Sequence, residues 1–247
     1  MLRNATDLLV KWNDRKNRKP LIVWGARQVG KTYLVKDIFA EEYYSNSYIY
    51  IDFKIEDEIR DFCDHTANAE KIIEYICLYK GKDITKNTLL IFDEIQECPN
   101  IISSLKYFCQ DFREIPVIAT GSMVRIRLQR ELTRNGSTQK FMFPVGKIEQ
   151  LTIYPLSFDE FLLNSNEKLF NATKKAYKSR TPLSSSIHEL VLNEFYKYLL
   201  IGGMPEAVNT YFESNSFLES RRVLKDLYDN YLSDMELYQA SRESCLR

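Results

Sequence analysis

The sequence has few of the residues that would indicate a metal centre or a disulfide framework. Of its 247 residues, five are cysteine and two are histidine. The cysteines are odd in number and no pair has Cys-x-x-Cys spacing, which argues against both a disulfide scaffold and a zinc site. We therefore expect reduced thiols. The two histidines, His65 and His188, lie far apart in the sequence, so no histidine-based metal centre is expected.

The chain also lacks an excess of charge and lacks long apolar runs. Its 34 Lys and Arg residues balance 34 Asp and Glu residues, so no overall basic field attracts nucleic acid. The short basic patches carry no recognition motif, and we expect no DNA or RNA partner. No stretch approaches the ~18 apolar residues of a membrane span. The first residues contain no apolar segment of signal-peptide type. We expect a cytoplasmic protein without a membrane partner.

Short apolar runs alternate with helical patterns through the first 155 residues. Such runs, bounded by turn residues, are typical of buried strands. Near-continuous apolar strands separated by helices indicate a parallel sheet covered on both faces, and right-handed crossovers make it a doubly wound α/β sheet. The runs are 21–24, 48–51, 89–92 and 116–119, with a fifth candidate at 148–153, and the helical segments are 3–15, 31–41, 69–80, 100–112 and 123–134.

The pattern changes after Pro155. Strand-like runs stop, and helical periodicity is found at 158–163, at 187–201 and in a long final helix beyond Phe217. Residues 164–186 are polar and rich in lysine, which predicts a loop or a mobile helix. We therefore predict two parts: an α/β core, residues 1–155, and a smaller all-helical part, residues 156–247.

Glycine is scarce, at 8 residues, and two glycines bound the most informative segment of the chain. This segment matches the phosphate-binding pattern G-x-x-x-x-G-K-[ST] in full, directly after a predicted strand and at the start of a predicted helix. Glycines allow a tight turn, backbone N–H groups cradle anionic oxygens, and the helix dipole adds positive potential. The predicted nucleotide-binding residues are Gly25, Ala26, Arg27, Gln28, Val29, Gly30, Lys31, Thr32 and Tyr33.

Two side chains of this segment have specific expected roles. Lys31 is expected to bring its full positive charge to the β and γ phosphates. The Thr32 hydroxyl is a hard oxygen ligand suited to Mg²⁺. Arg27 either lies near the phosphates or faces water.

Two carboxylates follow the apolar run 89–92. Asp93 is expected to bind a water on Mg²⁺, and Glu94 to orient and activate the water that attacks the γ-phosphate. The alternative is that the two acids begin a helix and interact favourably with its dipole. Because the chain also contains a complete phosphate-binding loop, we predict the metal and catalytic roles for this pair.

The run 116–119 leads into Thr120, Gly121 and Ser122. If this strand lies between the loop-bearing strand and the acidic strand, its end faces the γ-phosphate. Thr120 or Ser122 then senses the phosphate or positions the attacking water. The alternative is that Ser122 caps the following helix.

Five segments occur in the order expected for a known family: GARQVGKT, LLIFDEIQ, IPVIATGS, LTIYPLSFDEFL and YLLIGGMPEAV. They resemble the prokaryotic AAA-type P-loop ATPases that usually carry a C-terminal domain of unknown function. The resemblance extends from about residue 19 to about residue 238. It implies a five-stranded AAA-like core with a helical lid, Mg-ATP as ligand, and ATP hydrolysis. Nucleotide state would reorient the lid, as in signal-transducing ATPases.

The resemblance also implies that the turn Gly203-Met204-Pro205 touches the nucleotide, with Pro205 near the base. The alternative is a helix–helix turn with Pro205 at the first helical position. Two features depart from the family pattern. Lys147 stands where many relatives have arginine, and lysine lacks the bidentate fork, so we assign it no transition-state role. The usual C-terminal domain does not follow, so we expect a fragment or a shorter protein.

A basic segment carries Arg125, Arg127, Arg130 and Arg134. It is either a solvated basic helix or the source of an arginine donated in trans within a homo-oligomer.

The leading hypothesis is a Mg-ATP-binding protein that hydrolyses ATP to drive a conformational switch towards an unidentified protein client. One alternative is a nucleotide-regulated signalling or binding module with negligible turnover. Another is a P-loop kinase, which is less favoured because a glutamate directly after the Mg-site aspartate favours water as acceptor. No guanine-reading Asn-Lys-x-Asp segment is present, which favours ATP.

Overall fold

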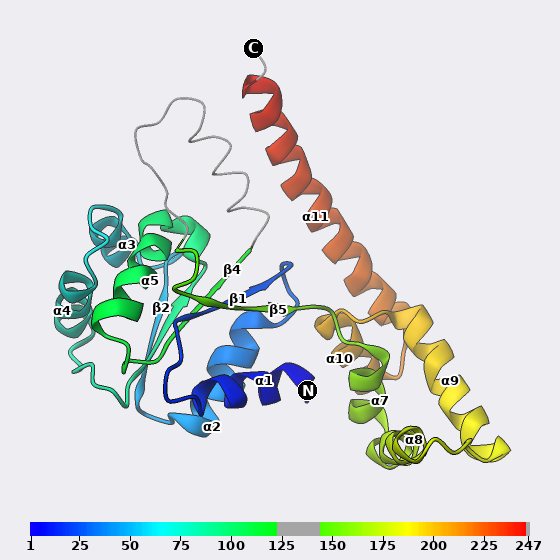
Figure 1. Ribbon diagram of the computed structural model, residues 1–247. Helices are drawn as coiled ribbons and strands as arrows, with labels where there is room; N and C mark the ends of the chain where they lie inside the picture. Colours follow the sequence, from blue (N-terminus) through cyan, green and yellow to red (C-terminus); the bar gives the residue numbers. More distant parts are fainter. Residues whose placement is uncertain (123–143, 246–247) are drawn as a thin grey trace. The chain divides into compact units, whose positions relative to one another are not determined.

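The computed structural model describes residues 1–122 and 144–245, and it describes the side chains of the last helix as far as Ser233. The chain divides into two compact units. The sheet unit is Ala5–Ile153, and the helical unit is Met1–Asn4 together with the chain from Tyr154 onward (Figure 1). Within the described ranges, no helix combines the length and the apolar character that a membrane span requires.

The sheet unit is built on a five-stranded parallel sheet in the order β2-β3-β4-β1-β5. This arrangement confirms the doubly wound sheet predicted from the apolar runs. Strand β4 pairs with β1 on one side and with β3 on the other, so the condition placed on the Thr120–Ser122 hypothesis is met. The strands are β1 (Leu21–Gly25), β2 (Tyr48–Asp52), β3 (Leu89–Asp93), β4 (Val117–Gly121) and β5 (Glu149–Ile153).

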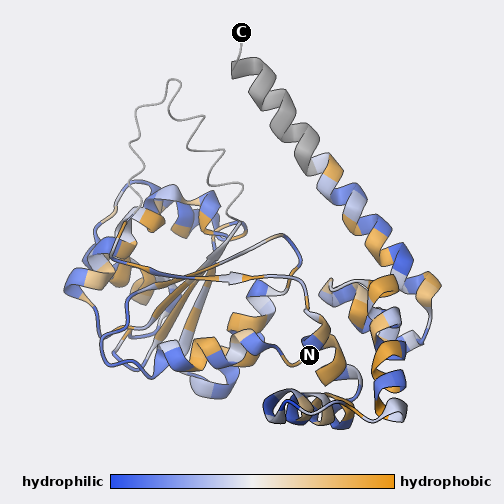
Figure 2. Ribbon diagram, turned by 45° about the vertical axis from the view of Figure 1, so that its right-hand side comes forward, coloured by the Kyte–Doolittle hydropathy of each residue, from blue (hydrophilic) through white to orange (hydrophobic). Residues whose placement is uncertain are grey.

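Helices cover both faces of this sheet. Helices α3, α4 and α5 contact one another on one face, and α1, η1 and α2 lie on the other (Figure 1). Apolar and hydrophilic positions are interspersed along these helices (Figure 2), and apolar residues such as Phe39, Ile72 and Ile76 are fully buried. The bounds are α1 (Asn4–Asn13), the π-helix η1 (Tyr33–Ala40), α2 (Glu41–Tyr43), α3 (Asp57–Asp64), α4 (Ala69–Lys80), the 3₁₀-helix η2 (Ile95–Glu97) and α5 (Pro99–Asp111).

The alternation of side chains along the strands explains why both faces are buried. On β1, Ile22 and Trp24 join the main core cluster with α3, α4 and α5, whereas Leu21 and Val23 are buried outside that cluster. Successive residues of a strand point to opposite faces, so a strand that is apolar throughout needs cover on both sides. The same cluster takes Ile49, Ile51, Leu90, Phe92, Val117 and Ala119 from the other strands.

The helix after the phosphate-binding loop differs from a regular α-helix. It begins directly after Gly30, whose carbonyl oxygen accepts a hydrogen bond of 2.9 Å from the Leu34 N–H. Residues Tyr33–Ala40 then form the π-helix η1, within the helical segment predicted at 31–41. A π-helix has hydrogen bonds between residues five apart and is rare, so a helical pattern in the sequence predicts the helix without predicting this form.

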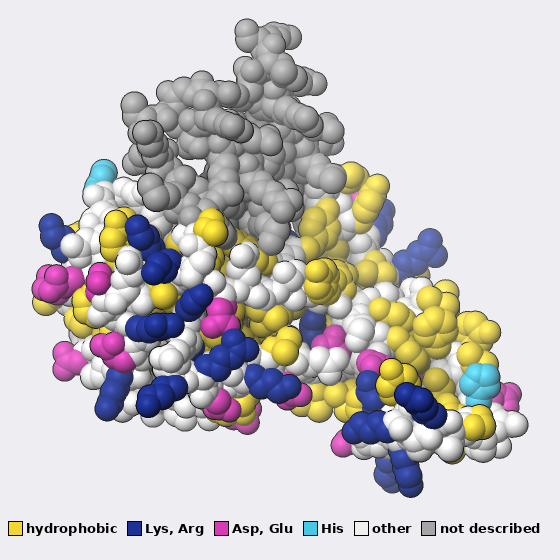
Figure 3. Space-filling model, viewed as in Figure 1, with side chains coloured by type: hydrophobic (Ala, Val, Ile, Leu, Met, Phe, Trp, Pro, Cys, Tyr) yellow, Lys and Arg dark blue, Asp and Glu magenta, His cyan; other side chains and the backbone are white. Residues whose placement is uncertain are grey.

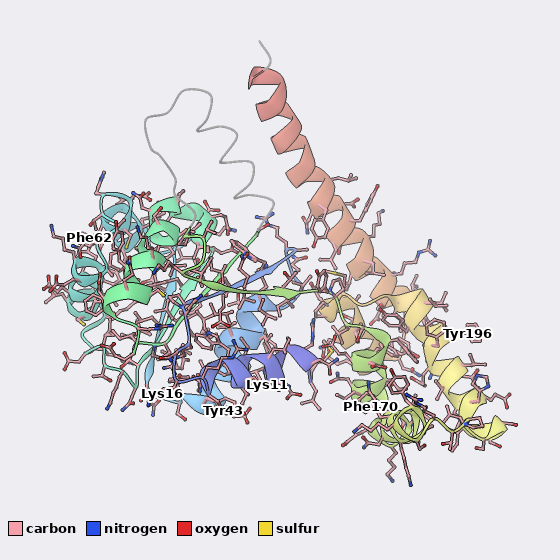
Figure 4. The ribbon with its side chains drawn as sticks, in the orientation of Figure 1. Lys11, Lys16, Tyr43, Phe62, Phe170 and Tyr196 are labelled. Atoms are coloured by element: carbon pink, nitrogen blue, oxygen red, sulfur yellow. The ribbon has the colours of Figure 1, made fainter. Side chains whose placement is uncertain are left out.

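The helical unit contains α7 (Phe158–Ser165), α8 (Glu167–Ser179), α9 (Ser185–Ile201), α10 (Pro205–Ser214) and α11 (Phe217–Cys245). The stretch predicted as a loop or mobile helix contains the regular helix α8. Asn166 caps it by accepting a hydrogen bond from the Leu169 N–H at 3.0 Å, and Leu169 is buried. Phe170 lies on α8 with the Lys174 ammonium 5.3 Å from its ring (Figure 4).

A small apolar core holds the helical unit together. Leu156, Phe161, Ile201, Val208 and Tyr211 form its buried cluster. Part of α9 stays exposed, and hydrophobic side chains gather over it (Figure 3). Among the exposed residues is Tyr196, which projects from the helix (Figure 4). The apolar pattern of 187–201 is therefore not wholly a core pattern.

The two segments that carry the family resemblance in the helical unit contact each other. The Leu156 N–H donates to the Gly203 carbonyl at 2.6 Å, and the Tyr198 hydroxyl donates to the Leu156 carbonyl at 2.9 Å. The turn between α9 and α10 is thus fixed on the segment that enters α7.

Candidate active site

The phosphate-binding loop joins β1 to η1. Its backbone leaves no room for a side chain at one position and has positive φ at two others. A Cβ on Gly25 would lie 2.6 Å from the Ile153 carbonyl oxygen and 2.9 Å from Val29 Cγ2. Gln28 and Gly30 have positive φ, at 60° and 85°. Val29 is fully buried and anchors the loop, whereas Ala26 and Gln28 are exposed. Loops with residues in this conformation form concave nests of N–H groups that bind anions.

Lys31 is held inside this loop with 8% of its surface exposed. Its ammonium donates to the Gly25 carbonyl at 3.2 Å and to the Ala26 carbonyl at 2.8 Å. Burial lowers the pKa of Lys31, and the charges of Glu94 and Asp93 oppose that shift. A desolvated cation is stabilised by a nearby anion, which makes Lys31 a strong partner for phosphate.

Asp93, at the end of β3, is the centre of the hydrogen-bond network and is only 3% exposed. Its Oδ2 accepts from the Thr32 hydroxyl and from the Tyr50 hydroxyl, each at 2.7 Å. Its Oδ1 accepts from the Glu94 N–H at 3.0 Å and from the Thr120 hydroxyl. The carboxylate thus joins the end of the phosphate-binding loop to β2 and β4.

The oxygen atoms of Thr32 and Asp93 fit a magnesium site. They are adjacent, and hydroxyl and carboxylate oxygens are the ligands that Mg²⁺ prefers. Within the described ranges, no three His, Cys, Asp or Glu residues are grouped to hold a metal. Mg²⁺ commonly takes one or two protein ligands and completes its shell with water and substrate phosphates, so the Thr32 and Asp93 oxygens are enough for the fit.

Glu94 follows Asp93 in an unusual backbone conformation, with φ 53° and ψ 44°. Non-glycine residues seldom adopt this left-handed region, and such residues cluster at functional sites. The half-buried Glu94 carboxylate accepts a hydrogen bond from the Gln96 side-chain amide. The Gln96 oxygen in turn accepts from the Ser122 N–H at 3.1 Å.

The structure brings most of the residues predicted from the sequence to one edge of the sheet. Lys31, Thr32, Asp93 and Glu94 lie together with the buried residues Thr120 and Ser122 at the end of β4. The choice between the two hydroxyls stays open as a sensing prediction, because Thr120 contacts Asp93 through its hydroxyl and Ser122 contacts Gln96 through its backbone.

The remaining predicted residues form three groups. Tyr33 is the half-exposed first residue of η1. Pro205 is in the first turn of α10, within the helical unit, and its contact with a nucleotide stays a prediction. The residues Arg125, Arg127, Arg130 and Arg134 lie outside the described residues.

Sequence reasoning missed two residues of the network, Tyr50 and Gln96. Tyr50 had a signal, because the alternation in Tyr48-Ile49-Tyr50-Ile51 places Tyr50 opposite the apolar isoleucines. Gln96 also had a signal, because it is a polar residue next to the apolar Ile95 in the segment that follows Asp93 and Glu94. Neither signal identifies a partner, because the partner depends on which strands are neighbours.

Residues 17–162, more than half of the chain, match the model of a family described as an AAA domain. The chain belongs to this AAA domain family. It is thus an AAA-type P-loop ATPase by family, in agreement with the resemblance found in its sequence. No match is found among curated proteins.

One solved structure agrees with the fold. The Walker-type ATPase PABY2304 of Pyrococcus abyssi is similar over 97% of this chain and 75% of its own, with a TM-score of 0.53 and 15% identity. AMPPCP-bound DnaA from Aquifex aeolicus is similar over 95% of this chain and 68% of its own, with a TM-score of 0.46 and 14% identity. At these identities the first likeness shows the fold of this AAA domain and no more.

Proposed function

We propose that this AAA domain protein binds Mg-ATP and hydrolyses it to drive a conformational switch. One observation carries the proposal. The Thr32 hydroxyl donates to Asp93 at 2.7 Å, the buried Lys31 directly precedes Thr32, and Glu94 directly follows Asp93. A phosphate-binding cation, a pair of metal-binding oxygens and a candidate base therefore occur at one edge of the sheet.

Each residue of the site has a distinct role in this proposal. Backbone N–H groups of the loop and the Lys31 ammonium bind the triphosphate, with help from the dipole of the following helix. Thr32 and Asp93 would hold Mg²⁺, which when bound neutralises phosphate charge. Glu94 orients the attacking water and accepts its proton. The end of β4, through Thr120 or Ser122, detects whether the γ-phosphate is present.

The switch itself belongs to the helical unit. The Gly203-Met204-Pro205 turn would contact the nucleotide and pass its state to α10, towards an unidentified protein client. An arginine from a second copy of the chain would stabilise charge on the transferred phosphoryl group, as trans arginines do in related chemistry. Turnover would then increase with protein concentration.

Phosphate release and nucleotide binding, measured together, test the proposal. We expect Lys31→Ala to lose Mg-ATP binding. We expect Glu94→Gln to bind Mg-ATP as the wild type does and to release phosphate about 100-fold more slowly, the usual effect of removing a general base. If the wild type binds Mg-ATP but releases phosphate no faster than Lys31→Ala, the result would instead favour the regulated binding module. ATP consumed faster with an added acceptor than with water would favour the kinase. Absence of binding heat with Mg-ATP would contradict all three.

A further inference from the structure

Gln96 is buried deeply for a side chain that carries both a donor and an acceptor. Its residue is 1% exposed, and both ends of its amide have partners from different parts of the site. The amide nitrogen donates to the Glu94 carboxylate, and the amide oxygen accepts from the Ser122 N–H at 3.1 Å. A buried polar group held at both ends has a fixed orientation, because releasing either bond leaves a desolvated polar atom without a partner.

The end of β4 is shaped to receive this amide. A Cβ on Gly121 would lie 2.9 Å from Gln96 Oε1 and 2.9 Å from Ile95 Cγ1. Real Cβ atoms essentially never approach so closely, so glycine is what allows the amide to approach the β4 backbone. The neighbouring residue Thr120 binds the other acid of the pair, Asp93. Both acids are therefore tied to the same short segment of backbone at the end of β4.

We infer that Gln96 is a positioning residue that holds the Glu94 carboxylate where it can activate the water that attacks the γ-phosphate, and that Gln96 links Glu94 to the end of β4. Glu94 needs such a support because it lies in the left-handed region outside any regular strand or helix. A displacement of β4 by the γ-phosphate would reach Glu94 through one rigid amide. The inference rests on the proposed ATP hydrolysis and adds the residue through which the base and the sensing strand communicate.

A double-mutant cycle tests this role, because a residue that acts through Glu94 has nothing to act on once Glu94 is changed. The four proteins are the wild type, Gln96→Met, Glu94→Gln and the double variant, assayed for single-turnover phosphate release with labelled ATP. We expect Gln96→Met to lower the single-turnover rate about tenfold with ATP affinity held within about twofold, the pattern of a misplaced catalytic group. In the Glu94→Gln background, Gln96→Met should cause no further loss.

Two additional variants separate positioning from folding. Gln96→Asn keeps both amide functions, but its side chain is one methylene shorter and cannot bridge Glu94 and the Ser122 N–H together, so its single-turnover rate should also decrease. It carries the test if Gln96→Met does not fold. Gln150→Met is a control for the same substitution elsewhere in the sheet: Gln150 is exposed on β5, and its side-chain oxygen accepts a hydrogen bond from the Trp24 indole N–H at 2.7 Å. It should keep the wild-type rate.

The outcomes are distinct. Full rates in both Gln96 variants, or an equal loss in the Glu94→Gln background, would overturn the role of Gln96 while leaving ATP hydrolysis intact. A rate loss in Gln96→Met matched by Gln150→Met and by a lower melting temperature would assign Gln96 a structural role only. A wild type that releases no more phosphate than Lys31→Ala contradicts the proposed function, and the inference fails with it.

Discussion

At the scale of single residues, the site is organised around Asp93. Side chains from the loop, β2 and β4 all donate to its two oxygens, so its orientation is fixed before any ligand contacts it. Tyr50 is the donor whose role is least evident from motifs. Burial raises the pKa of Tyr50, and the charge of Asp93 raises it further, so the hydroxyl keeps its proton and remains a donor at neutral pH.

Tyr50→Phe should weaken the response of the protein to magnesium. The change removes the hydroxyl from Asp93 Oδ2 and leaves the ring beside the Lys36 ammonium, which lies 4.5 Å from its centroid. Loss of a group that orients a metal ligand typically costs about tenfold in metal affinity. We therefore expect about a tenfold higher Mg²⁺ concentration for half-maximal nucleotide binding, measured by calorimetry at stepped Mg²⁺.

Tyr48→Phe provides the control for this experiment. Tyr48 lies two residues earlier on β2 and donates to a carboxylate in the same way, but its partner is Glu41, outside the site. Equal shifts in the two variants would show that Tyr50 acts on the stability of β2 and not on Asp93.

At the scale of elements, the Gly203 turn packs closely against Leu156 within the helical unit. A Cβ on Gly203 would lie 2.2 Å from the Leu156 carbonyl oxygen, a backbone atom that cannot move aside alone. Gly203→Ala should therefore destabilise the helical unit by about 2–4 kcal/mol, as overpacking and loss of a buried hydrogen bond do. Thermal unfolding followed by circular dichroism measures this.

Gly81→Ala is the comparison for that prediction. Gly81 also ends a helix, with φ 62°, but a Cβ at this position would have no atom within 4 Å. Only the conformational cost of about 1 kcal/mol remains there. A loss at Gly203 no greater than at Gly81 would mean that the turn yields easily and that the Leu156 contact contributes little.

The elements also show where sequence reasoning succeeds and where it stops. Four of the strands were predictable because each is a short apolar run that ends in turn residues, and β5 was a candidate from its alternation. The π form of η1 was not predictable, because a helical pattern indicates a helix without fixing its hydrogen-bond spacing and π-helices are rare. For residues 164–186 the sequence left a loop or a mobile helix open, because the composition is polar, and the structure has helix α8 there. Pro205 begins α10, which is the position that the alternative interpretation of the Gly203-Met204-Pro205 turn gave it.

At the scale of the whole molecule, nucleotide binding should stabilise one unit directly. At about 100 times its dissociation constant, a ligand adds about 2.7 kcal/mol to the folded state. For a chain of this size that corresponds to a rise in melting temperature of roughly 5–10 °C. We expect this rise with Mg²⁺ and a non-hydrolysable ATP analogue, and none in Lys31→Ala. Hydrogen exchange should locate the added protection in β1, β3 and β4, and protection confined to α9–α11 would contradict the site.

The order of the strands in the sheet explains which parts of the site could be predicted from the sequence. Lys31, Thr32, Asp93 and Glu94 follow from local patterns, since each lies in a segment whose chemistry is complete in itself. The links through Tyr50 and Gln96 depend on the order β2-β3-β4-β1-β5, which no local pattern contains. A residue whose partner lies on a neighbouring strand becomes visible only when the neighbours are known.

The first four residues belong to the helical unit although the sheet unit follows them in the chain. The Leu2 N–H donates to the Asn164 side chain at 2.8 Å, and the Asn4 N–H donates to the buried Glu160 carboxylate at 2.8 Å. A fluorophore or purification tag fused at Met1 would therefore perturb, and report on, the helices beyond Tyr154. A label at the amino terminus, used to follow nucleotide loading, would therefore report on the helical unit and not directly on the phosphate-binding loop of the sheet unit.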